Sequence, residues 1–537
     1  MQLHRVLVAN RGEIALRVFR TCARLGIGTV AVAAPDDLGS LHARSADTAV
    51  EIASYLDPDE HVRAARDAGA DAVHPGYGFL AESADFAAAV EDAGLTWVGP
   101  PSAVLRLGGD KLAAKRVAAA AGVPVVPSGS PADVGLPLVV KAAAGGGGRG
   151  MRIVRDTGDL ADALDAAQRE AEAAFGDGTV FCERYLERPR HVEVQLLADA
   201  HGAVISLGQR DCSVQRRHQK VVEESPPPGL AAATGRALDE AAIAFARAVG
   251  YVGAGTAEFL VDGDDVFFLE LNGRIQVEHP VTEAVTGIDL VEQQLRIAAG
   301  ERLVTDRHKA EGHAIEARLY AEDPRTFLPR SGRVELLRLP SGVRVDAGVE
   351  EGDEVGTRYD PLLAKIVSHG RDRGEALDRL AAALSETAVE GVDTNLAFLR
   401  WLVAHPAFRA GGVDTAFLVE HPPLSVPPPR LAGGSWGEPW RLNLPAPAPA
   451  SPPDVDAGAH ERGHGATGSV TAPMPGTVLA VHVAAGDAVE PRQPLVTLEA
   501  MKMEHPVTAP FAATVTAVTV TVGDGVAAGR PLVELEG

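Results

Sequence analysis

The C-terminal part of the chain contains an internal repeat, and this repeat constrains the fold more than any other feature of the sequence. TVLAVHVAAGDAVEPRQPLVTLE at 477–499 aligns with TVTAVTVTVGDGVAAGRPLVELE at 514–536, an offset of 514 − 477 = 37. Alternating valines and Gly-Asp pairs at equivalent places are typical of short strands joined by tight turns. Two copies of one β unit predict a small all-β sandwich with quasi-twofold symmetry over residues 469–537. The matched positions are Val478/Val515, Val481/Val518, Val483/Val520, Gly486/Gly523, Asp487/Asp524, Pro494/Pro531 and Leu498/Leu535.

A single lysine lies between the two copies. The connecting segment AMKMEHPVTAPFAA follows directly after a predicted strand, which places Lys502 on an exposed hairpin turn, flanked by Met501 and Met503. Another enzyme can modify a lysine on such a turn without unfolding the domain. An ordinary surface lysine is the alternative, but the symmetric setting and the methionines favour a site of covalent modification.

A proline-rich stretch separates this sandwich from the rest of the chain. Residues 422–468 include PPLSVPPPR and PAPAPASPP and are predicted to form a linker. A flexible linker of about 40 residues spans roughly 35 Å. An inert spacer and a swinging tether both fit this composition.

Composition and charge narrow the class of protein. A chain of 537 residues is long enough for several domains. Its net charge of 50 − 73 = −23 argues against nucleic acid and anionic membrane as partners. The three cysteines, Cys22, Cys182 and Cys212, have no metal-binding spacing and indicate reduced thiols. Since the sequence shows no signal peptide and no apolar membrane span, we expect a soluble, cytoplasmic protein.

The part before the linker is predicted to be α/β. Short aliphatic strands at Arg5–Ala9, Thr29–Ala33 and Ala72–His74 alternate with helices such as Gly12–Leu25. This order predicts a parallel sheet in an N-terminal α/β domain over residues 1–110. A second region, 111–186, begins with a helix at Lys111–Ala121, and a longer mixed α+β region follows over 187–421.

A run of glycines lies in the second region. The strand-like LPLVVKAA at 136–143 precedes it and MRIVR at 151–155 follows it, so the run joins two strands. A Walker or dinucleotide loop would lead into a helix instead. A mobile hairpin lid over nucleotide phosphates and an ordinary flexible loop both remain possible. Lys141 favours the lid, because an ammonium in an apolar strand needs an anion; Lys111 is either a second phosphate ligand or a solvated helix residue.

A polar strand face over 256–278 carries the strongest chemical signal. Two predicted strands, Thr256–Val261 and Val266–Leu271, flank a turn that brings Glu258 opposite Glu270. Beyond them Asn272, Arg274, Gln276 and Glu278 follow at every second position, on one face if the backbone stays extended. Facing carboxylates with an amide oxygen suit Mg²⁺ or Mn²⁺, which predicts Glu258, Glu270 and Asn272 as metal ligands. Arg274 can bind an oxyanion and Glu278 can remove a proton, whereas a solvated strand face is the alternative.

With these residues described, the chain resembles the ATP-grasp enzymes, and among them biotin carboxylase, over about residues 1–425. The similarity lies in VLVANRGEIALRV, HPGYGFLAES, GGGGRGMR, ERYLERPRHVEVQ, RDCSVQRRHQKVVEE and ELNGRIQVEHPVTE. The segment from Val470 to Gly537, with its Ala-Met-Lys-Met motif, resembles the biotinyl domain family. The resemblance implies an α/β fold: a three-part ATP-grasp biotin carboxylase with a glycine-loop lid, followed by an all-β biotinyl sandwich.

The resemblance also implies site residues. ATP would be held by Lys111, Lys141, Gly145, Gly146, Gly147, Gly148, Arg149, Gly150, Glu183, Arg184, Tyr185, Leu186, His191, Gln215 and His218. Bicarbonate would be bound by Lys220, Arg274, Gln276, Val277 and Glu278, and Arg344 would bind the biotin ureido group. The catalytic set would be Lys220, Arg274, Glu278 and Arg344, and a biotin protein ligase would attach biotin to Lys502.

The implied activity is ATP-dependent carboxylation of carrier-bound biotin from bicarbonate, through carboxyphosphate. The closest overall resemblance is to the short α subunit of bacterial acetyl- or propionyl-CoA carboxylases. Since no part of the chain resembles a carboxyltransferase, we expect a separate β subunit and an oligomeric complex. The alternatives are the α subunit of a methylcrotonyl- or geranyl-CoA carboxylase, another ATP-grasp ligase, or a non-catalytic biotin-bearing scaffold.

Overall fold

The structure of the chain is a computed structural model. It describes residues 2–143, 151–175, 177–216, 219–304, 310–422, 468–500, 503–527 and 529–536. Several predicted features lie outside the described residues: the glycine loop from Gly145 to Gly150, His218, Lys502 and nearly all of the linker.

The N-terminal region is a parallel sheet covered by helices, as the alternation of strands and helices predicts. Five strands pair in the order β3-β2-β1-β4-β5. Val6, Leu7 and Val8 of β1 are fully buried, as expected for a sheet covered on both faces. The strands are β1 (Arg5–Val8), β2 (Gly28–Ala33), β3 (Thr48–Glu51), β4 (Ala72–His74) and β5 (Thr96–Trp97), and the helices are α1 (Gly12–Leu25), α2 (Leu41–Ser45), α3 (Pro58–Asp67), α4 (Ala84–Asp92) and α5 (Ser102–Gly109).

A small antiparallel sheet carries the segment around the glycine loop. Its strands pair in the order β6-β9-β7-β8. Because β7 pairs antiparallel with β8, the glycine loop does join the two strands of a hairpin, as predicted. The elements are α6 (Lys111–Ala120), β6 (Ser128–Gly129), α7 (Pro131–Val134), β7 (Leu138–Ala142), β8 (Arg152–Val154), α8 (Leu160–Phe175) and β9 (Val180–Arg184).

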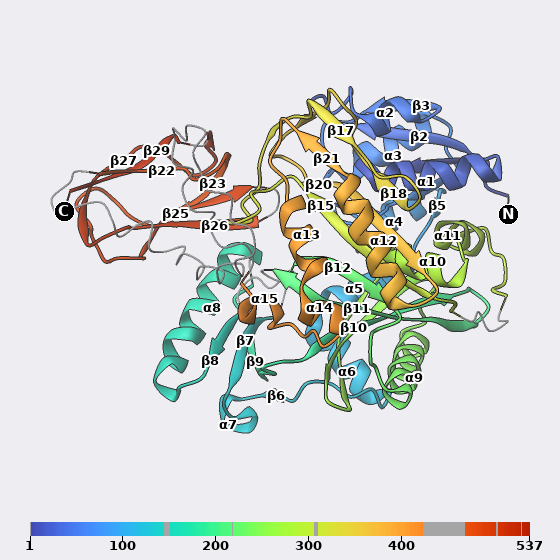
Figure 1. Cartoon of the computed structure of the whole chain (residues 1–537), viewed down its shortest axis with the longest axis horizontal. Helices are drawn as coiled ribbons and strands as arrows, with labels where there is room; N and C mark the ends of the chain where they lie inside the picture. Colours follow the sequence, from blue (N-terminus) through green and yellow to red (C-terminus); the bar gives the residue numbers. More distant parts are fainter. Residues whose placement is uncertain are drawn as a thin grey trace, which may run out of the picture.

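An eight-stranded antiparallel sheet forms the centre of the molecule (Figure 1). Its order is β14-β13-β10-β11-β12-β15-β20-β18, so β12 pairs directly with β15 and one sheet runs through most of the region 190–370. The strands are β10 (Arg190–Ala198), β11 (Val204–Arg216), β12 (Gln219–Ser225), β13 (Gly253–Asp262), β14 (Asp265–Asn272), β15 (His313–Tyr320), β18 (Arg344–Ala347) and β20 (Leu362–Gly370). Around it lie α9 (Ala232–Ala248), α10 (His279–Thr286), α11 (Leu290–Ala298), β16 (Gly332–Arg333), β17 (Leu336–Arg338), β19 (Glu354–Val355), α12 (Arg373–Glu386), β21 (Ala388–Glu390), α13 (Leu396–Ala404), α14 (Pro406–Ala410) and α15 (Phe417–Glu420).

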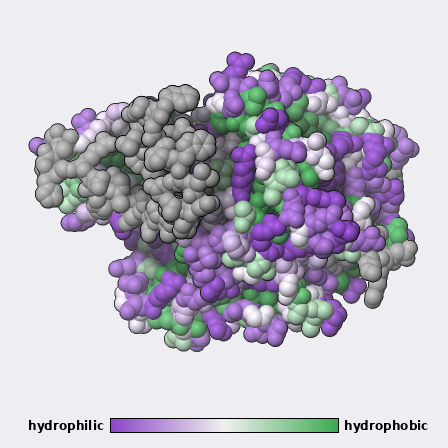
Figure 2. Space-filling model, in the orientation of Figure 1, coloured by the Kyte–Doolittle hydropathy of each residue, from purple (hydrophilic) through white to green (hydrophobic). Residues whose placement is uncertain are grey.

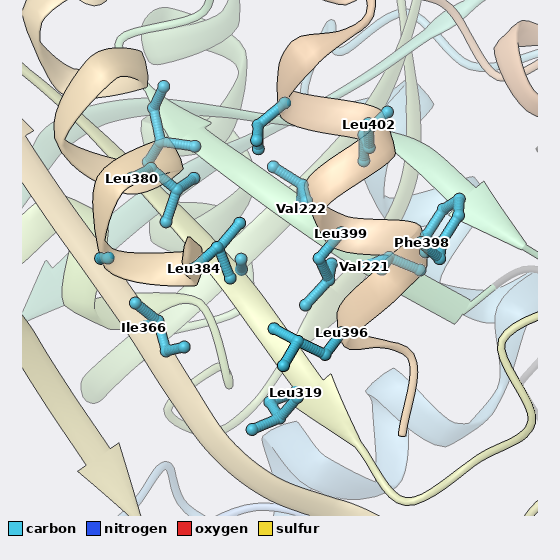
Figure 3. Packing of buried hydrophobic residues seen from close by; sticks show 14 of the residues in the cluster. Val221, Val222, Leu319, Ile366, Leu380, Leu384, Leu396, Phe398, Leu399 and Leu402 are labelled. Atoms are coloured by element: carbon cyan, nitrogen blue, oxygen red, sulfur yellow. The ribbon is translucent and has the colours of Figure 1, made fainter. Parts of the chain in front are cut away.

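Helices α12 and α13 cover one face of this sheet (Figure 3). Leu380 of α12 and Leu399 of α13 meet Val222, Leu319 and Ile366 of the central strands, and all five side chains are buried. The apolar side chains of each helix lie on the face turned to the sheet. This packing leaves the opposite face of the strands available for polar side chains.

The C-terminal segment is the symmetric sandwich that the repeat predicts. Two four-stranded sheets, β22-β29-β27-β24 and β26-β25-β23-β28, pack around one apolar core. Gly486 and Gly523 both have a positive φ, of 98° and 93°, at equivalent turns. Leu328, from the loop after β15, packs against the same core. The strands are β22 (Gly468–Thr471), β23 (Gly476–Val481), β24 (Ala488–Val489), β25 (Pro494–Ala500), β26 (Met503–Thr508), β27 (Ala513–Val518), β28 (Gly525–Val526) and β29 (Pro531–Glu536).

Within the described ranges, no helix combines the length and apolar character needed to cross a bilayer. On the face shown in Figure 2, hydrophilic residues cover much of the surface, with hydrophobic residues between them. This surface is consistent with the net charge of −23.

The core between α13 and the central sheet provides a test of the fold. Leu399→Ala should lower the free energy of unfolding by about 3 kcal/mol, because the side chain is fully buried and its loss leaves a cavity. The change can be measured as a shift in the denaturant midpoint. Leu56, which is 62% exposed, is the matched control, and Leu56→Ala should change stability by less than about 0.5 kcal/mol. Equal effects of the two substitutions would contradict the described packing.

Candidate active site

A buried ammonium group is the centre of the site. Lys220 Nζ, on β12, donates to Glu193 Oε2 at 2.5 Å, Glu258 Oε1 at 2.9 Å and Glu278 Oε1 at 2.7 Å. Burial opposes its charge, but the three carboxylates outweigh burial and raise the pKa of Lys220 well above its usual value. Three carboxylates exceed the charge of one ammonium, and two arginines balance them, since Arg210 contacts Glu193 and Arg318 contacts Glu278.

Strand register explains why the carboxylates meet. Glu193 on β10 lies directly opposite Glu258 on β13, which in turn lies opposite Glu270 on β14. Paired residues of an antiparallel sheet project to the same face. On the other side of Glu193 lies Arg210 of β11, whose Nε donates to Glu193 Oε1 at 2.5 Å.

Glu258 and Glu270 differ sharply in environment. Glu258 accepts from Asn272 Nδ2 at 2.8 Å and Gln276 Nε2 at 3.0 Å, and its Oε2 lies 2.8 Å from His191 Nε2. Burial alone would favour the neutral acid, but Lys220 and His191 hold the pKa of Glu258 well below its usual range. Burial and the facing Glu258 raise the pKa of Glu270. A divalent cation between the two carboxylates would relieve that repulsion, so their oxygens and that of Asn272 fit a magnesium or manganese ion.

The polar segment after β14 follows the predicted side-chain order but not the predicted backbone. The condition of an extended backbone to residue 278 is not met: β14 ends at Asn272, and Glu278 is the N-cap residue of α10. The polar side chains still converge, because Arg274 donates to Gln276 Oε1 at 2.7 Å and to Asn272 Oδ1 at 2.9 Å. Hydrogen bonds between side chains therefore replace the strand as the force that aligns them.

Glu278 lies at the junction of three strands. Its Oε1 is 2.7 Å from Lys220 Nζ and 3.9 Å from Cys212 Sγ, and its Oε2 accepts from Arg318 Nη2 at 3.0 Å. Burial opposes ionisation, yet Lys220, Arg318 and Arg210 together hold the pKa of Glu278 well below its usual range. Glu278 is therefore an ionised carboxylate at neutral pH.

Three lysines gather near the small sheet. Lys141 Nζ on β7 donates to Glu183 Oε2 at 2.6 Å, and Lys115 of α6 contacts the other oxygen of the same carboxylate. Burial and the neighbouring ammonium groups lower the pKa of Lys141 to about 8 and that of Lys115 to about 7. The pKa of Lys111 is also lowered by burial. Such a cluster favours binding of a polyanion such as a triphosphate.

Arg344 lies at the far end of the eight-stranded sheet. Its Nη1 contacts Glu283 Oε2 and its Nη2 contacts Asp346 Oδ2, both at 2.7 Å. Nearby, the fully buried Lys365 donates to the carbonyl oxygen of Val277 at 2.9 Å, which ties this end of the sheet to the segment before Glu278. Val277 is therefore connected to the central sheet through Lys365. Arg344, itself on β18 of that sheet, is held by Glu283 and Asp346.

The remaining predicted ATP residues fall into two groups. His191 Nδ1 and Gln215 Nε2 lie 2.6 Å apart beside Glu258. Arg184 is the last residue of β9, and Tyr185 and the buried Leu186 follow it. The guanidinium carbon of Arg155 lies 5.3 Å from the centre of the Tyr185 ring.

Several residues around Lys220 and in the lysine cluster were not predicted from the sequence. They are Lys115, Glu193, Arg210, Arg318 and Lys365. A signal for one existed in the sequence: His191, Glu193 and Gln195 alternate with valines, the same period of two that singled out residues 270–278. The others depend on strand pairings between distant segments, which no local pattern reveals.

The fold and the site together define a protein with an ATP-binding ligase core and a separate biotin-type carrier. Family models match four consecutive segments: "Biotin carboxylase, N-terminal domain" at 2–105, "Carbamoyl-phosphate synthase L chain, ATP binding domain" at 110–306, "Biotin carboxylase C-terminal domain" at 316–420 and "Biotin-requiring enzyme" at 468–535. These matches confirm the predicted use of ATP and biotin.

Known proteins of similar sequence or structure indicate the same family. Biotin carboxylase of Halalkalibacterium halodurans is 46% identical over 78% of this chain and 97% of its own length. The methylcrotonoyl-CoA carboxylase subunit alpha of Arabidopsis thaliana is 50% identical, over 78% of this chain but only 61% of its own length. The biotin carboxylase domain of Hydrogenobacter thermophilus 2-oxoglutarate carboxylase, solved with MgADP, ADP and bicarbonate, has a TM-score of 0.77 at 42% identity and covers 79% of this chain and 98% of that chain. The chain belongs to the biotin carboxylase family and carries a biotinyl domain.

The lysine cluster yields a prediction about protons. At pH 8 Lys115 and Lys141 should be partly neutral, because their pKa values lie near 7 and 8. Binding of MgATP should raise both pKa values, so it should take up about one proton, and affinity should fall as the pH rises further. Calorimetry in buffers of different ionisation enthalpy measures this uptake.

Lys115→Gln should reduce the proton uptake and weaken MgATP binding about tenfold, the loss of one charge-assisted contact. Arg116→Gln removes an exposed charge from the same helix and should change neither quantity. Proton release on binding, or an unchanged uptake in Lys115→Gln, would contradict the assignment.

Proposed function

We propose that this chain is the α subunit of an acyl-CoA carboxylase and that it carboxylates biotin on its own carrier domain, using ATP and bicarbonate. The observation that supports this most directly is the ionised Glu278, paired with Lys220 beside the facing carboxylates Glu258 and Glu270. Such a cluster combines a base, an anion site and a cation site within one buried face. The solved relative named above was crystallised with MgADP and bicarbonate, which are the ligands this arrangement would accommodate.

Binding of the nucleotide would follow from charge. The triphosphate would lie among Lys111, Lys115 and Lys141, under the glycine loop, with Glu183–Leu186, His191, Gln215 and His218 as the remaining contacts. Glu258, Glu270 and Asn272 would hold the divalent cations. When bound, these cations neutralise phosphate charge that builds up during phosphoryl transfer.

Bicarbonate would bind beside Lys220, Arg274, Gln276 and Val277. Glu278 would accept the proton of bicarbonate, and a bicarbonate oxygen would form a bond to the γ-phosphorus while the bond to ADP breaks. The products of this step are carboxyphosphate and ADP. Carboxyphosphate would then divide into CO₂ and phosphate within the closed site, where water is excluded.

Arg344 would hold the acceptor. A guanidinium group held by Glu283 and Asp346 is fixed in place, and it would donate to the ureido oxygen of the biotin carried on Lys502. The biotin ring would supply the nitrogen that bonds to CO₂, and the phosphate released from carboxyphosphate would take the proton that this nitrogen loses. The linker over 422–468 would act as the tether that brings the carrier to this end of the sheet.

Which acyl-CoA is finally carboxylated depends on the partner. The match to methylcrotonoyl-CoA carboxylase extends over 445 residues, or 78% of this chain. The proposed carboxylation of biotin does not involve the acyl group, so this match does not decide which acyl-CoA is used. The chain spans about three fifths of that relative's length, and residues 421–467 alone separate its C-terminal-domain and carrier matches. This short spacing is what favours the acetyl- or propionyl-CoA type with a separate carboxyltransferase β subunit; methylcrotonyl- or geranyl-CoA is the alternative.

Another ATP-grasp ligase is the second candidate, since the ATP-binding region matches a carbamoyl-phosphate synthase model. The biotin carrier on the same chain favours carboxylation of biotin instead. Assay of the purified chain with bicarbonate, with ammonia and with free biotin separates the two activities.

Glu278→Gln should lower bicarbonate-dependent ATP hydrolysis by about 100-fold or more, because the variant lacks the proton acceptor. Binding of MgATP should stay within about twofold, since Glu278 does not belong to the lysine cluster. Steady-state phosphate release and calorimetry measure the two effects. Glu301→Gln, an exposed glutamate outside the site, serves as control, and full activity of Glu278→Gln would rule out the base assignment.

Lys502→Arg should abolish biotin incorporation while leaving ATP hydrolysis with free biotin intact. A streptavidin blot of chain co-expressed with a biotin protein ligase measures incorporation, with Lys309→Arg as control. Reconstitution with candidate β subunits should then show Lys502-dependent carboxylation of acetyl- or propionyl-CoA at least about tenfold faster than of methylcrotonyl-CoA. The opposite preference would assign the chain to the methylcrotonyl type.

A further inference from the structure

Behind Glu278 the central sheet buries two glutamates that the proposed reaction does not use. Glu223 on β12 lies directly opposite Glu316 on β15, so their side chains share one face of the sheet. Both residues are 0% exposed. Among the described residues, neither carboxyl oxygen of Glu316 has a hydrogen-bond partner.

One arginine connects this pair to the active site. Arg318 Nη2 lies 2.5 Å from Glu223 Oε1 and 3.0 Å from Glu278 Oε2. A single guanidinium nitrogen therefore divides its charge between a carboxylate of the pair and the proposed base. The pair is therefore connected to Glu278 through Arg318, without a direct contact between Glu316 and Glu278 being required.

Within the described part of the chain, Arg318 is the one cation that contacts the pair. Lys365, opposite Arg318 on β20, contacts Val277 and Glu13 instead. Two ionised carboxylates at this depth would leave one without any hydrogen bond, which is strongly unfavourable. Burial raises the pKa of Glu316 well above its usual value and that of Glu223 to about 7, which agrees with the geometry.

We propose that Glu223 and Glu316 share one proton and act through Arg318 as positioning residues that tune the strength of Glu278 as a base. When the pair gains its proton, Arg318 interacts more strongly with Glu278 and weakens it as a base. When the pair loses its proton, Arg318 is drawn toward Glu223 and Glu278 becomes a stronger proton acceptor. This inference rests on the proposed role of Glu278.

Other charged groups surround these residues. They are Lys220 on β12, Arg210 and Cys212 on β11, Glu193 on β10, Glu258 on β13, Tyr320 on β15, Lys365 on β20, His279 of α10 and, farther out, Glu13 of α1 with Arg344 and Asp346 of β18. Lys220 holds Glu278 ionised in either state of the pair, so the pair changes the strength of the base and not its charge. The rate should therefore rise with pH as the pair loses its proton, near pH 7 from the value for Glu223.

The two isosteric variants should act in opposite directions. In Glu316→Gln the remaining Glu223 stays ionised to lower pH, so the rise in kcat for ATP hydrolysis should move to lower pH with the plateau within about twofold. In Glu223→Gln the guanidinium of Arg318 forms an ion pair with Glu278 only. We therefore expect kcat to be about tenfold lower and not to rise with pH. Profiles between pH 6 and 9 measure both.

Glu224→Gln is the matched control. Glu224 is the next residue on β12 and equally buried, but it pairs with His313 and Arg373. That variant should lose thermal stability and keep the parent pH profile. Parent-like profiles in both Glu316→Gln and Glu223→Gln, or a shift of both in the same direction, would overturn the proposal.

A spectroscopic measurement separates this proposal from the proposed function. The full chain at neutral pH should show the infrared carbonyl stretch of buried protonated carboxyl groups, and Glu316→Gln should lose the part of this band that comes from the shared proton. The band is expected even if the chain proves inactive with bicarbonate, and it does not require that Glu223→Gln folds. Identical carbonyl bands in the parent and in Glu316→Gln would contradict the proposal that Glu223 and Glu316 share a proton.

Discussion

The contact between Lys220 and its three carboxylates is the interaction on which the rest of the site depends. Glu193, Glu258 and Glu278 come from β10, β13 and the start of α10, and the ammonium offsets the repulsion between their carboxylates. Arg210 also contacts Glu193 and Arg318 also contacts Glu278, so cations balance the three carboxylates. Such a cluster can keep a base ionised and still attract divalent cations at the neighbouring Glu270.

Contacts between residues close together in the sequence could be predicted from it, whereas contacts between distant segments could not. The facing of Glu258 and Glu270 follows from one hairpin turn, and the symmetric sandwich follows from a repeat within one segment. Both are local, so residue patterns determine them. Lys220 was assigned to the site only through family resemblance, and its contacts with the three carboxylates were not predicted. They depend on the order of β13, β10, β11 and β12 in the sheet, which no local pattern encodes.

The errors have the same origin. The period of two from 270 to 278 correctly grouped the polar side chains, but it could not tell a strand from a chain of side-chain hydrogen bonds ending at a helix N-cap. Lys115 was missed because, on a helix, it gives no alternating signal, and its partner Glu183 lies on β9, which follows α8. Arg318 and Glu316 were missed because β15 joins the sheet beside β12 from a segment about 90 residues later.

The continuous sheet also explains how one fold can keep acid groups of very different strength close together. Lys220 and Arg318 lower the pKa of Glu278 by direct contact, whereas Glu316, on the same strand as Arg318, has no hydrogen-bond partner in the described chain and its pKa is raised. The difference comes from which carboxyl group the two cations contact, because burial is similar for both residues. A single arginine at the boundary between β12 and β15 is therefore enough to link a neutral acid to an ionised base, and a rearrangement of that strand pair would change both together.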